Sequence, residues 1–194
     1  MTELPTLILA SQSPRRAELL RRLSLPFKAV PAHIDEDALG HLEPPRQALE
    51  LATQKARAIW QSGQWVLAAD TVVALGAETL GKPRNATENE VFLRRLSGHT
   101  HTVYTGFTIL RPDGVLHREV AKAQVTFRVL QEWELKWYAQ SGEGLDKAGG
   151  YGVQGLGMVL VERIEGDFYS VMGLPVSQVW QRLSELGYFA AQSG

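Results

Sequence analysis

The chain has 194 residues, a net charge of −1 and no cysteine. The length suits one domain with a sizeable core or two small lobes. The near-neutral charge does not favour a nucleic-acid or membrane-surface binder, and the lack of cysteine excludes disulfides and a thiolate nucleophile. No apolar run approaches the roughly 20 residues that span a bilayer, and the N-terminus lacks the pattern of a secretion signal. We therefore expect a cytoplasmic protein.

The first elements are a strand, a polar turn and a helix. Residues 7–10 form a continuous apolar run, which is typical of a strand covered on both faces. Ser13 is a suitable N-cap and Pro14 fits the first helical position, so a helix is predicted from there. The free N–H groups at a helix start favour phosphate, and the turn adds Ser11, Arg15 and Arg16. A solvated surface helix fits this stretch equally well.

The next elements carry one carboxylate and one lysine of interest. A strand is predicted at 26–30, and an acidic loop at 33–37 contains Glu36. A helix at 45–61 has an apolar stripe with Lys55 beside it. On spacing alone, a lysine in this position is expected to extend its ammonium to solvent.

A long apolar strand is predicted at 64–75, and Asp70 and Thr71 interrupt it. A carboxylate is expensive to bury unless it is paired or holds a metal. We therefore favour a functional role for Asp70 over the alternative, in which it caps the backbone of a turn or bulge.

The rest of the chain alternates strands and helices. We expect first a hairpin that is closed by 81–83. A helix follows, which begins with a capping box at 87–90 and ends at 97–98. Two antiparallel strands come next, at 101–110 and 115–127. A helix at 131–140, a glycine-rich loop at 146–157, a hairpin of 158–164 with 168–172, and a helix from 176 follow. This order predicts the α/β class, with a mixed, twisted sheet flanked by helices and two lobes with an active-site cleft.

The polar residues that resist a purely structural interpretation fall into two groups. The cations are Arg15, Arg16, Lys55 and Lys82, and the carboxylates are Glu36 and Asp70. Cations neutralise phosphate oxygens, carboxylates hold a hard divalent cation, and one carboxylate can accept a proton from water. The inventory therefore fits a site for a metal-bound polyphosphate, although the chain has no Walker-type phosphate loop.

Short motifs along the chain are those of one known family. They are LASQSPRR at 9–16, IDE at 34–36, KA at 55–56, ADTVV at 69–73, GKP at 81–83, LSGH at 96–99, VYTG at 103–106, DKAGGYGVQG at 146–155 and GLP at 173–175. In these motifs and their order, the chain resembles the Maf family of nucleoside triphosphate pyrophosphatases. The resemblance covers nearly the whole chain and implies a single domain over 1–194 with a fold like that of Maf and Ham1 proteins.

The resemblance implies hydrolysis of a nucleoside triphosphate to its monophosphate and pyrophosphate, with a divalent Mg, Mn or Co ion and a homodimer. It implies that Asp70 accepts a proton and that Glu36 and Asp70 hold the metal. The family's substrate-binding positions are matched by Ser11, Ser13, Arg15, Arg16, Lys55, Thr71, Lys82 and Gln154. Ser170 stands where asparagine is frequent in the family.

The motif at 146–155 is similar to that of the branch that acts on dTTP and UTP, with CTP or modified pyrimidine nucleotides as further substrates. In the family, positions matching Arg15, Thr71 and Gln154 bear on the choice of base. A glutamine amide offers the donor and the acceptor that uracil and thymine can pair with. The alternatives are a pyrophosphatase of 7-methyl-GTP or another purine nucleotide, and a non-enzymatic regulator of cell division.

Overall fold

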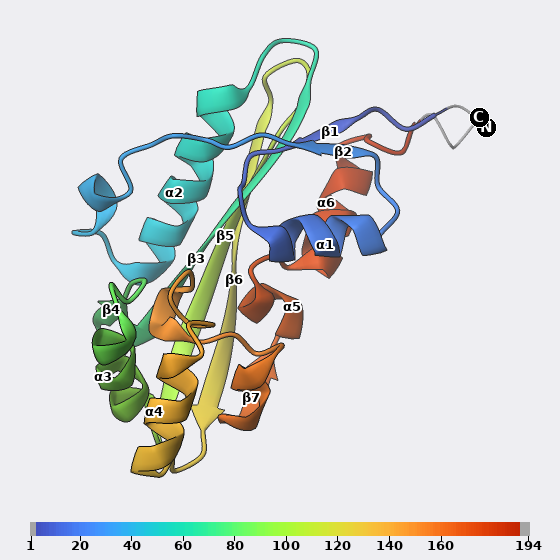
Figure 1. Cartoon of the computed structure of the whole chain (residues 1–194). Coiled ribbons are helices and arrows are strands. Elements are labelled where there is room, and N and C mark those ends of the chain that lie inside the picture. The colour runs from blue at the N-terminus through green and yellow to red at the C-terminus, as the bar shows by residue number, and fades with distance from the viewer. Residues whose placement is uncertain (1–2, 191–194) are drawn as a thin grey trace. The chain divides into compact units, whose positions relative to one another are not determined.

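The structure is a computed structural model that describes residues 3–190 (Figure 1). The strands are β1 (Leu7–Leu9), β2 (Phe27–Ala29), β3 (Trp65–Leu75), β4 (Glu78–Leu80), β5 (Thr100–Leu110), β6 (Leu116–Phe127) and β7 (Val161–Gly166). The helices are α1 (Pro14–Arg22), α2 (Pro44–Ile59), α3 (Ala86–Leu96), α4 (Glu132–Gln140), α5 (Phe168–Met172) and α6 (Val176–Glu185). Short 3-10 turns occupy Asp37–Leu39, Ala148–Gly150 and Leu156–Val159.

The seven strands form one mixed sheet in the order β2-β1-β3-β5-β6-β7, with β4 paired to β3. Strand β1 pairs in parallel with both β2 and β3, so that Leu7 lies opposite Phe27 on one side and Trp65 on the other. Strand β4 is antiparallel to β3, and β7 is antiparallel to β6. The predicted mixed sheet flanked by helices is therefore confirmed.

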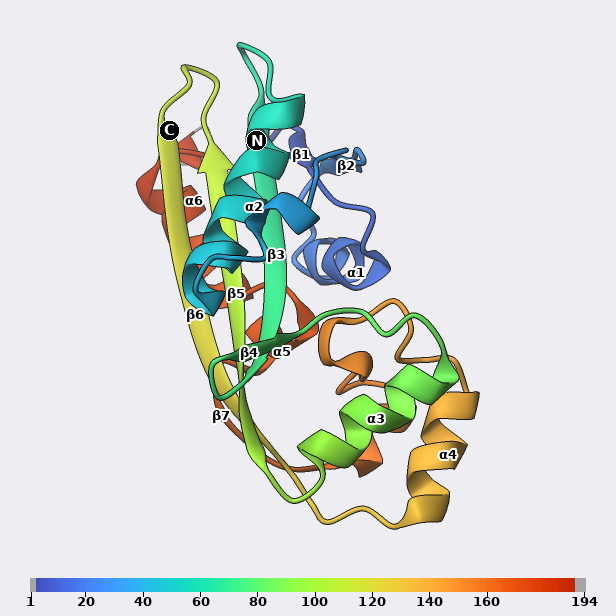
Figure 2. The same cartoon turned by 90° about the vertical axis from the view of Figure 1, so that its left-hand side faces the viewer.

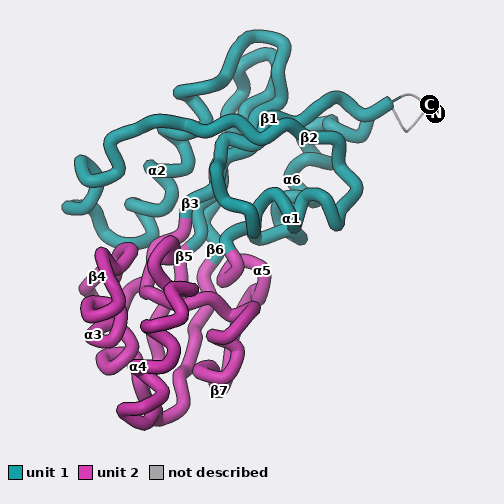
Figure 3. The backbone as a smooth tube through the Cα atoms, viewed as in Figure 1, with its two compact units in different colours: residues 1–70, 105–121, 173–194 teal, residues 71–104, 122–172 magenta. Residues whose placement is uncertain are grey.

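The chain divides into two compact units, each built from separate stretches (Figure 3). Unit 1 comprises residues 1–70, 105–121 and 173–194, and unit 2 comprises 71–104 and 122–172. Each of β3, β5 and β6 continues from one unit into the other. The cleft expected between two lobes stays a prediction.

One part of the core of unit 1 lies between the sheet and helix α2. Part of it is a cluster of buried apolar side chains, namely Ala10, Ala56, Val66, Ala68 and Leu110. Helix α2 approaches β5 so closely that a Cβ on Gly106 would lie 2.5 Å from the backbone of Ala48. Between the same two elements, the buried hydroxyls of Thr53 and Thr108 share a hydrogen bond of 3.1 Å. These contacts fix the position of α2, which carries Lys55.

In unit 2, α3 and α4 lie side by side (Figure 2). A buried aromatic group forms its own part of the core, because His101, Phe127 and Tyr151 meet edge to face. The His101 Nε2 and the Tyr151 hydroxyl share a hydrogen bond of 2.6 Å. Tyr151 lies in the glycine-rich loop, so this loop is ordered and attached to β5 rather than being a free connector.

Two local predictions were wrong. The N-cap of α3 is Asn85, whose Oδ1 accepts a hydrogen bond from Glu88 N at 2.9 Å, so no capping box starts at Thr87. The stretch 168–172 is the helix α5 and not a strand. Asp167 explains this, because its Oδ1 accepts from Tyr169 N at 2.9 Å as at a helix start. Strand β7 pairs with β6 instead.

Candidate active site

The turn between β1 and α1 is held by its own serines. Ser13 is the N-cap of α1, and its hydroxyl accepts a hydrogen bond from Arg16 N at 3.4 Å. Ser11 is buried, and its Oγ accepts from Ser13 N at 3.1 Å and from the Arg16 guanidinium at 3.3 Å. Each hydroxyl still has its own O–H to donate. The predicted cap is confirmed, and hydrogen bonds of its own side chains organise the turn.

The Arg16 side chain is held by the backbone of the loop between α5 and α6. Its Nε donates to the Gly173 carbonyl at 2.7 Å. Gly173 has a φ of +113°, and a Cβ there would lie 3.4 Å from the Arg16 Nε, so glycine suits this close approach. Gly173 belongs to a motif, but this role could not be predicted from the sequence, because the contact uses a backbone atom.

Arg16 also lies within electrostatic reach of the site's carboxylates. Burial lowers the pKa of Arg16, and the negative charges of Asp70 and, to a lesser extent, Glu36 act in the opposite direction. The neighbouring charge of Arg15 adds to the lowering. The turn after β1 and the two predicted metal ligands therefore belong to one electrostatic cluster in unit 1.

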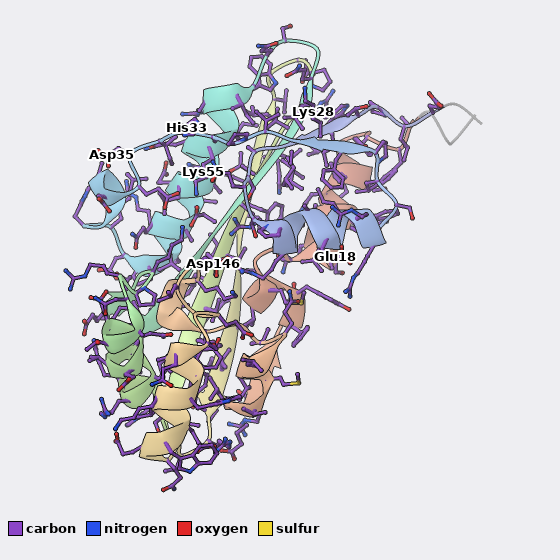
Figure 4. All side chains as sticks on the ribbon, in the orientation of Figure 1. Glu18, Lys28, His33, Asp35, Lys55 and Asp146 are labelled. Carbon is purple, nitrogen blue, oxygen red and sulfur yellow. The ribbon has the colours of Figure 1, made fainter. Side chains whose placement is uncertain are left out.

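The centre of this cluster is an ion pair between α2 and β3. The Lys55 ammonium contacts Asp70 Oδ2 and lies 2.6 Å from Glu36 Oε1. The side chains of Lys55 and Asp70 are each only 12% exposed, whereas that of Glu36 is 47% exposed. The expectation that Lys55 extends to solvent was wrong. Figure 4 labels this lysine on α2.

Strand β3 continues without a break through Asp70, so the alternative of a turn at this point was wrong as well. A carboxylate in a buried strand needs a partner of opposite charge, and Lys55 supplies it. The residue is thus held in the middle of the sheet with its charge balanced. This arrangement supports the functional interpretation of Asp70.

The donor set fits a hard divalent cation that shares its ligands with a substrate. Within residues 3–190, no group of three or more histidine, cysteine, aspartate or glutamate side chains is arranged for a metal. Glu36 and Asp70 nevertheless point one oxygen each at the same ammonium nitrogen, so one cation can contact both. Mg²⁺ is commonly bound by one or two carboxylates together with substrate phosphates and water.

The other predicted site residues belong to unit 2. Thr71 follows Asp70 in β3 and is half-buried, while Lys82 and Gln154 are exposed. The loop of Lys82 is tied to the glycine-rich loop, because Gly149 N donates to the Gly81 carbonyl at 3.1 Å. The roles predicted for these three residues in substrate binding stay predictions.

One residue that supports these loops was missed. Asn89 on α3 is fully buried, and its amide nitrogen donates to the Gly150 carbonyl at 2.7 Å. A signal was present in the sequence, because Asn89 shares a helix face with Leu93 and Leu96, which are also buried. A polar side chain on an apolar face predicts a buried hydrogen bond.

Comparison with known proteins identifies the family. A family model described as "Maf-like protein" matches residues 6–186. The chain belongs to the Maf family. A Maf relative from Thermus thermophilus, named "dTTP/UTP pyrophosphatase", is 54% identical over 184 residues, which are 95% of this chain and 96% of the relative. A relative from Deinococcus radiodurans with the same name is 50% identical over 96% of this chain and 95% of its own length.

Among solved structures, the Ham1 protein of Staphylococcus aureus overlaps 80% of this Maf chain and 79% of its own, with a TM-score of 0.47 and 12% identity. The resemblance to the Maf family that the motifs indicated is confirmed. In residues 3–190, no helix has the length and apolar character needed to cross a membrane.

Proposed function

We propose that this Maf protein hydrolyses dTTP and UTP to the nucleoside monophosphate and pyrophosphate. The proposal is supported by the names of relatives that match almost the whole chain at 50–54% identity. The structural observation that carries it is the buried ion pair of Asp70 with Lys55 beside Glu36, because it gathers a base and a counter-cation in one place. This cluster also lies within reach of the Arg16 charge.

In the proposed reaction, a water oxygen attacks the α-phosphorus and the bond from that phosphorus to the oxygen bridging to the β-phosphate breaks. Pyrophosphate is the leaving group. Asp70 accepts the proton that the attacking water loses, and a general base of this kind typically contributes roughly 10²–10⁴-fold to the rate. The paired Lys55 keeps the charge of Asp70 balanced until substrate arrives.

The remaining polar residues would bind the triphosphate. Arg15, Arg16, Lys55 and Lys82 would neutralise its oxygens, and the hydroxyls of Ser11 and Ser13 would donate to it together with the start of α1. Glu36 and Asp70 would be the protein ligands of a divalent Mg²⁺, Mn²⁺ or Co²⁺. Such an ion, when bound, withdraws charge from the phosphate oxygens.

Gln154 would be the main reader of the base. The Gln154 amide would pair with the carbonyl and N–H edge of uracil or thymine, and Arg15 and Thr71 would complete the selection. A base that leaves the Gln154 amide unpaired would be penalised. We further propose that the protein works in the cytoplasm as a homodimer without binding nucleic acid, which sedimentation with and without RNA would test.

A panel of triphosphates tests the proposal. Purified protein with each of the three metals is given dTTP, UTP, CTP, GTP and 7-methyl-GTP, and pyrophosphate release is measured. We expect dTTP and UTP to have the highest kcat/KM. A preference for 7-methyl-GTP would contradict the assignment of the base reader. Nucleotide binding without turnover under every metal would contradict an enzymatic function.

A further inference from the structure

The glycine-rich loop of unit 2 is held by one carboxylate. Glu143 lies in the turn after α4, and its two oxygens accept hydrogen bonds from two successive backbone amides. Leu156 N donates to Oε2 at 2.8 Å, and Gly157 N donates to Oε1 at 3.0 Å. The carboxylate therefore fixes the backbone on the C-terminal side of Gln154.

A buried phenol fixes the other side. Tyr138 on α4 is fully buried, and its hydroxyl accepts a hydrogen bond from Gly152 N at 3.1 Å. The same hydroxyl donates to Glu143 Oε1 at 2.9 Å. Burial raises the pKa of Tyr138, so the phenol keeps the proton that it donates. The two side chains together hold amides on both sides of Gln154, and we call this pair the loop clamp.

The glycines of the motif are what allow the loop to close on the clamp. Gly155 has a φ of +99°, and a Cβ there would lie 2.6 Å from Glu143 Oε2. A Cβ on Gly157 would lie 1.9 Å from the Gly152 carbonyl oxygen. A backbone oxygen cannot move aside to relieve so short a contact, so only glycine fits at position 157. Gly155 thus allows the loop to pack closely against Glu143, and Gly157 allows it to pack against its own backbone at Gly152.

We propose that Tyr138 and Glu143 are positioning residues that set the base preference by fixing the backbone that presents Gln154. The clamped amides lie two residues before Gln154 and two and three residues after it, and the Gln154 side chain is exposed. A base-reading amide discriminates only if its donor and acceptor are held in place before binding, because a misplacement of about 1 Å can cost up to about 100-fold. The proposal rests on the proposed function, in which Gln154 reads the base.

The first test measures the clamp without reference to activity. Glu143→Gln replaces one acceptor oxygen by a donor, and Tyr138→Phe removes the shared hydroxyl. Hydrogen exchange at the amides of Gly152, Leu156 and Gly157 is expected to accelerate at least tenfold in both variants. Glu162→Gln, at an exposed carboxylate on β7, is the matched control and should leave these amides unchanged. Unchanged exchange in Glu143→Gln would overturn the clamp.

The second test asks whether the clamp acts through Gln154. The ratio of kcat/KM for UTP to that for GTP is measured in wild type, Glu143→Gln, Gln154→Ala and the double variant. We expect Glu143→Gln to lower this ratio about 10- to 100-fold, mainly through KM for UTP, and to have no further effect in the Gln154→Ala background. Equal effects of Glu143→Gln in both backgrounds would overturn the proposal.

The two failures are distinguishable. If wild type releases no pyrophosphate from dTTP or UTP, the proposed function is overturned, while the exchange test still decides whether the clamp orders the loop. If wild type prefers UTP and Glu143→Gln loses amide protection without any change in the ratio, the proposed function stands and the positioning role is overturned.

Discussion

Replacing Lys55 with methionine removes the ammonium that balances Asp70. The two side chains are each 12% exposed, so the substitution leaves a carboxylate in the middle of β3 with its ion-pair partner gone. Methionine retains the volume of the aliphatic part, and the packing of α2 against the strand is preserved. The variant therefore isolates the electrostatic part of the interaction.

Breaking a buried pair by removing one partner costs about 3–5 kcal/mol. The lower end applies here, because the pair keeps some exposure and Glu36 already lies half in solvent. A loss of about 3 kcal/mol corresponds to a fall in melting temperature of about 6–12 °C for a chain of this size. Thermal unfolding at pH 7.5, followed by circular dichroism without divalent metal, measures it.

Three comparisons make this prediction specific. Lys55→Met combined with Asp70→Asn should recover most of the lost stability, because the side chain that has lost its ammonium partner is then uncharged. Lys136→Met, at an exposed lysine of α4, should change stability by less than about 0.5 kcal/mol. Added Mg²⁺ should raise the melting temperature of Lys55→Met more than that of wild type. A Lys55→Met protein as stable as wild type would show that the Lys55 ammonium does not stabilise the buried Asp70 carboxylate.

Three further predictions follow from other contacts. Gly106→Ala should lower the free energy of unfolding by about 3 kcal/mol, as measured in urea titrations, because the new Cβ meets backbone atoms of α2 that cannot move aside. An unchanged free energy of unfolding would contradict the close approach of α2 to β5. Burial lowers the pKa of His101 to about 4, below its ordinary 6.5, so the unfolded chain takes up a proton at a higher pH than the folded chain does. The free energy of unfolding should therefore fall by about 3 kcal/mol as the pH drops from 6.5 to 4. His101→Gln should reduce this pH dependence, and an unchanged pH dependence in the variant would contradict the role given to His101. Arg16→Lys should lower kcat/KM for dTTP and for GTP by the same factor, because Arg16 binds the phosphates. Arg15→Lys should change the ratio of kcat/KM for dTTP to that for GTP, because Arg15 takes part in base selection. The reverse pattern would contradict both roles.

Local patterns in the sequence predicted most of the fold. Three elements could be predicted because each depends only on residues that are neighbours in the sequence. They are the strand at 7–10, the Ser13 cap and the long apolar strand through Asp70. The strand predicted at 168–172 is a helix, because a short stretch with four apolar or aromatic side chains among five suits either structure, and the cap at Asp167 selects the helix. Short apolar runs do not reveal their periodicity.

The site could be predicted as a set of residue types, but its arrangement could not. An aspartate within an apolar strand pointed to Asp70, because burial of an unpaired charge is costly. The partner of Asp70 was not readable, because Lys55 lies 15 positions earlier on a helix and its spacing suggested exposure. The clamp on the glycine-rich loop was also missed, because it depends on backbone amides that have no sequence signature.

The role of Asp70 as general base is tested by pyrophosphate release from dTTP, measured for wild type and Asp70→Asn under saturating metal. Asparagine keeps the size of the side chain but cannot accept the proton of the attacking water. We expect kcat to fall by roughly 10²–10⁴-fold in a variant whose circular dichroism spectrum matches that of wild type. A folded Asp70→Asn protein that releases pyrophosphate at the wild-type rate would contradict it.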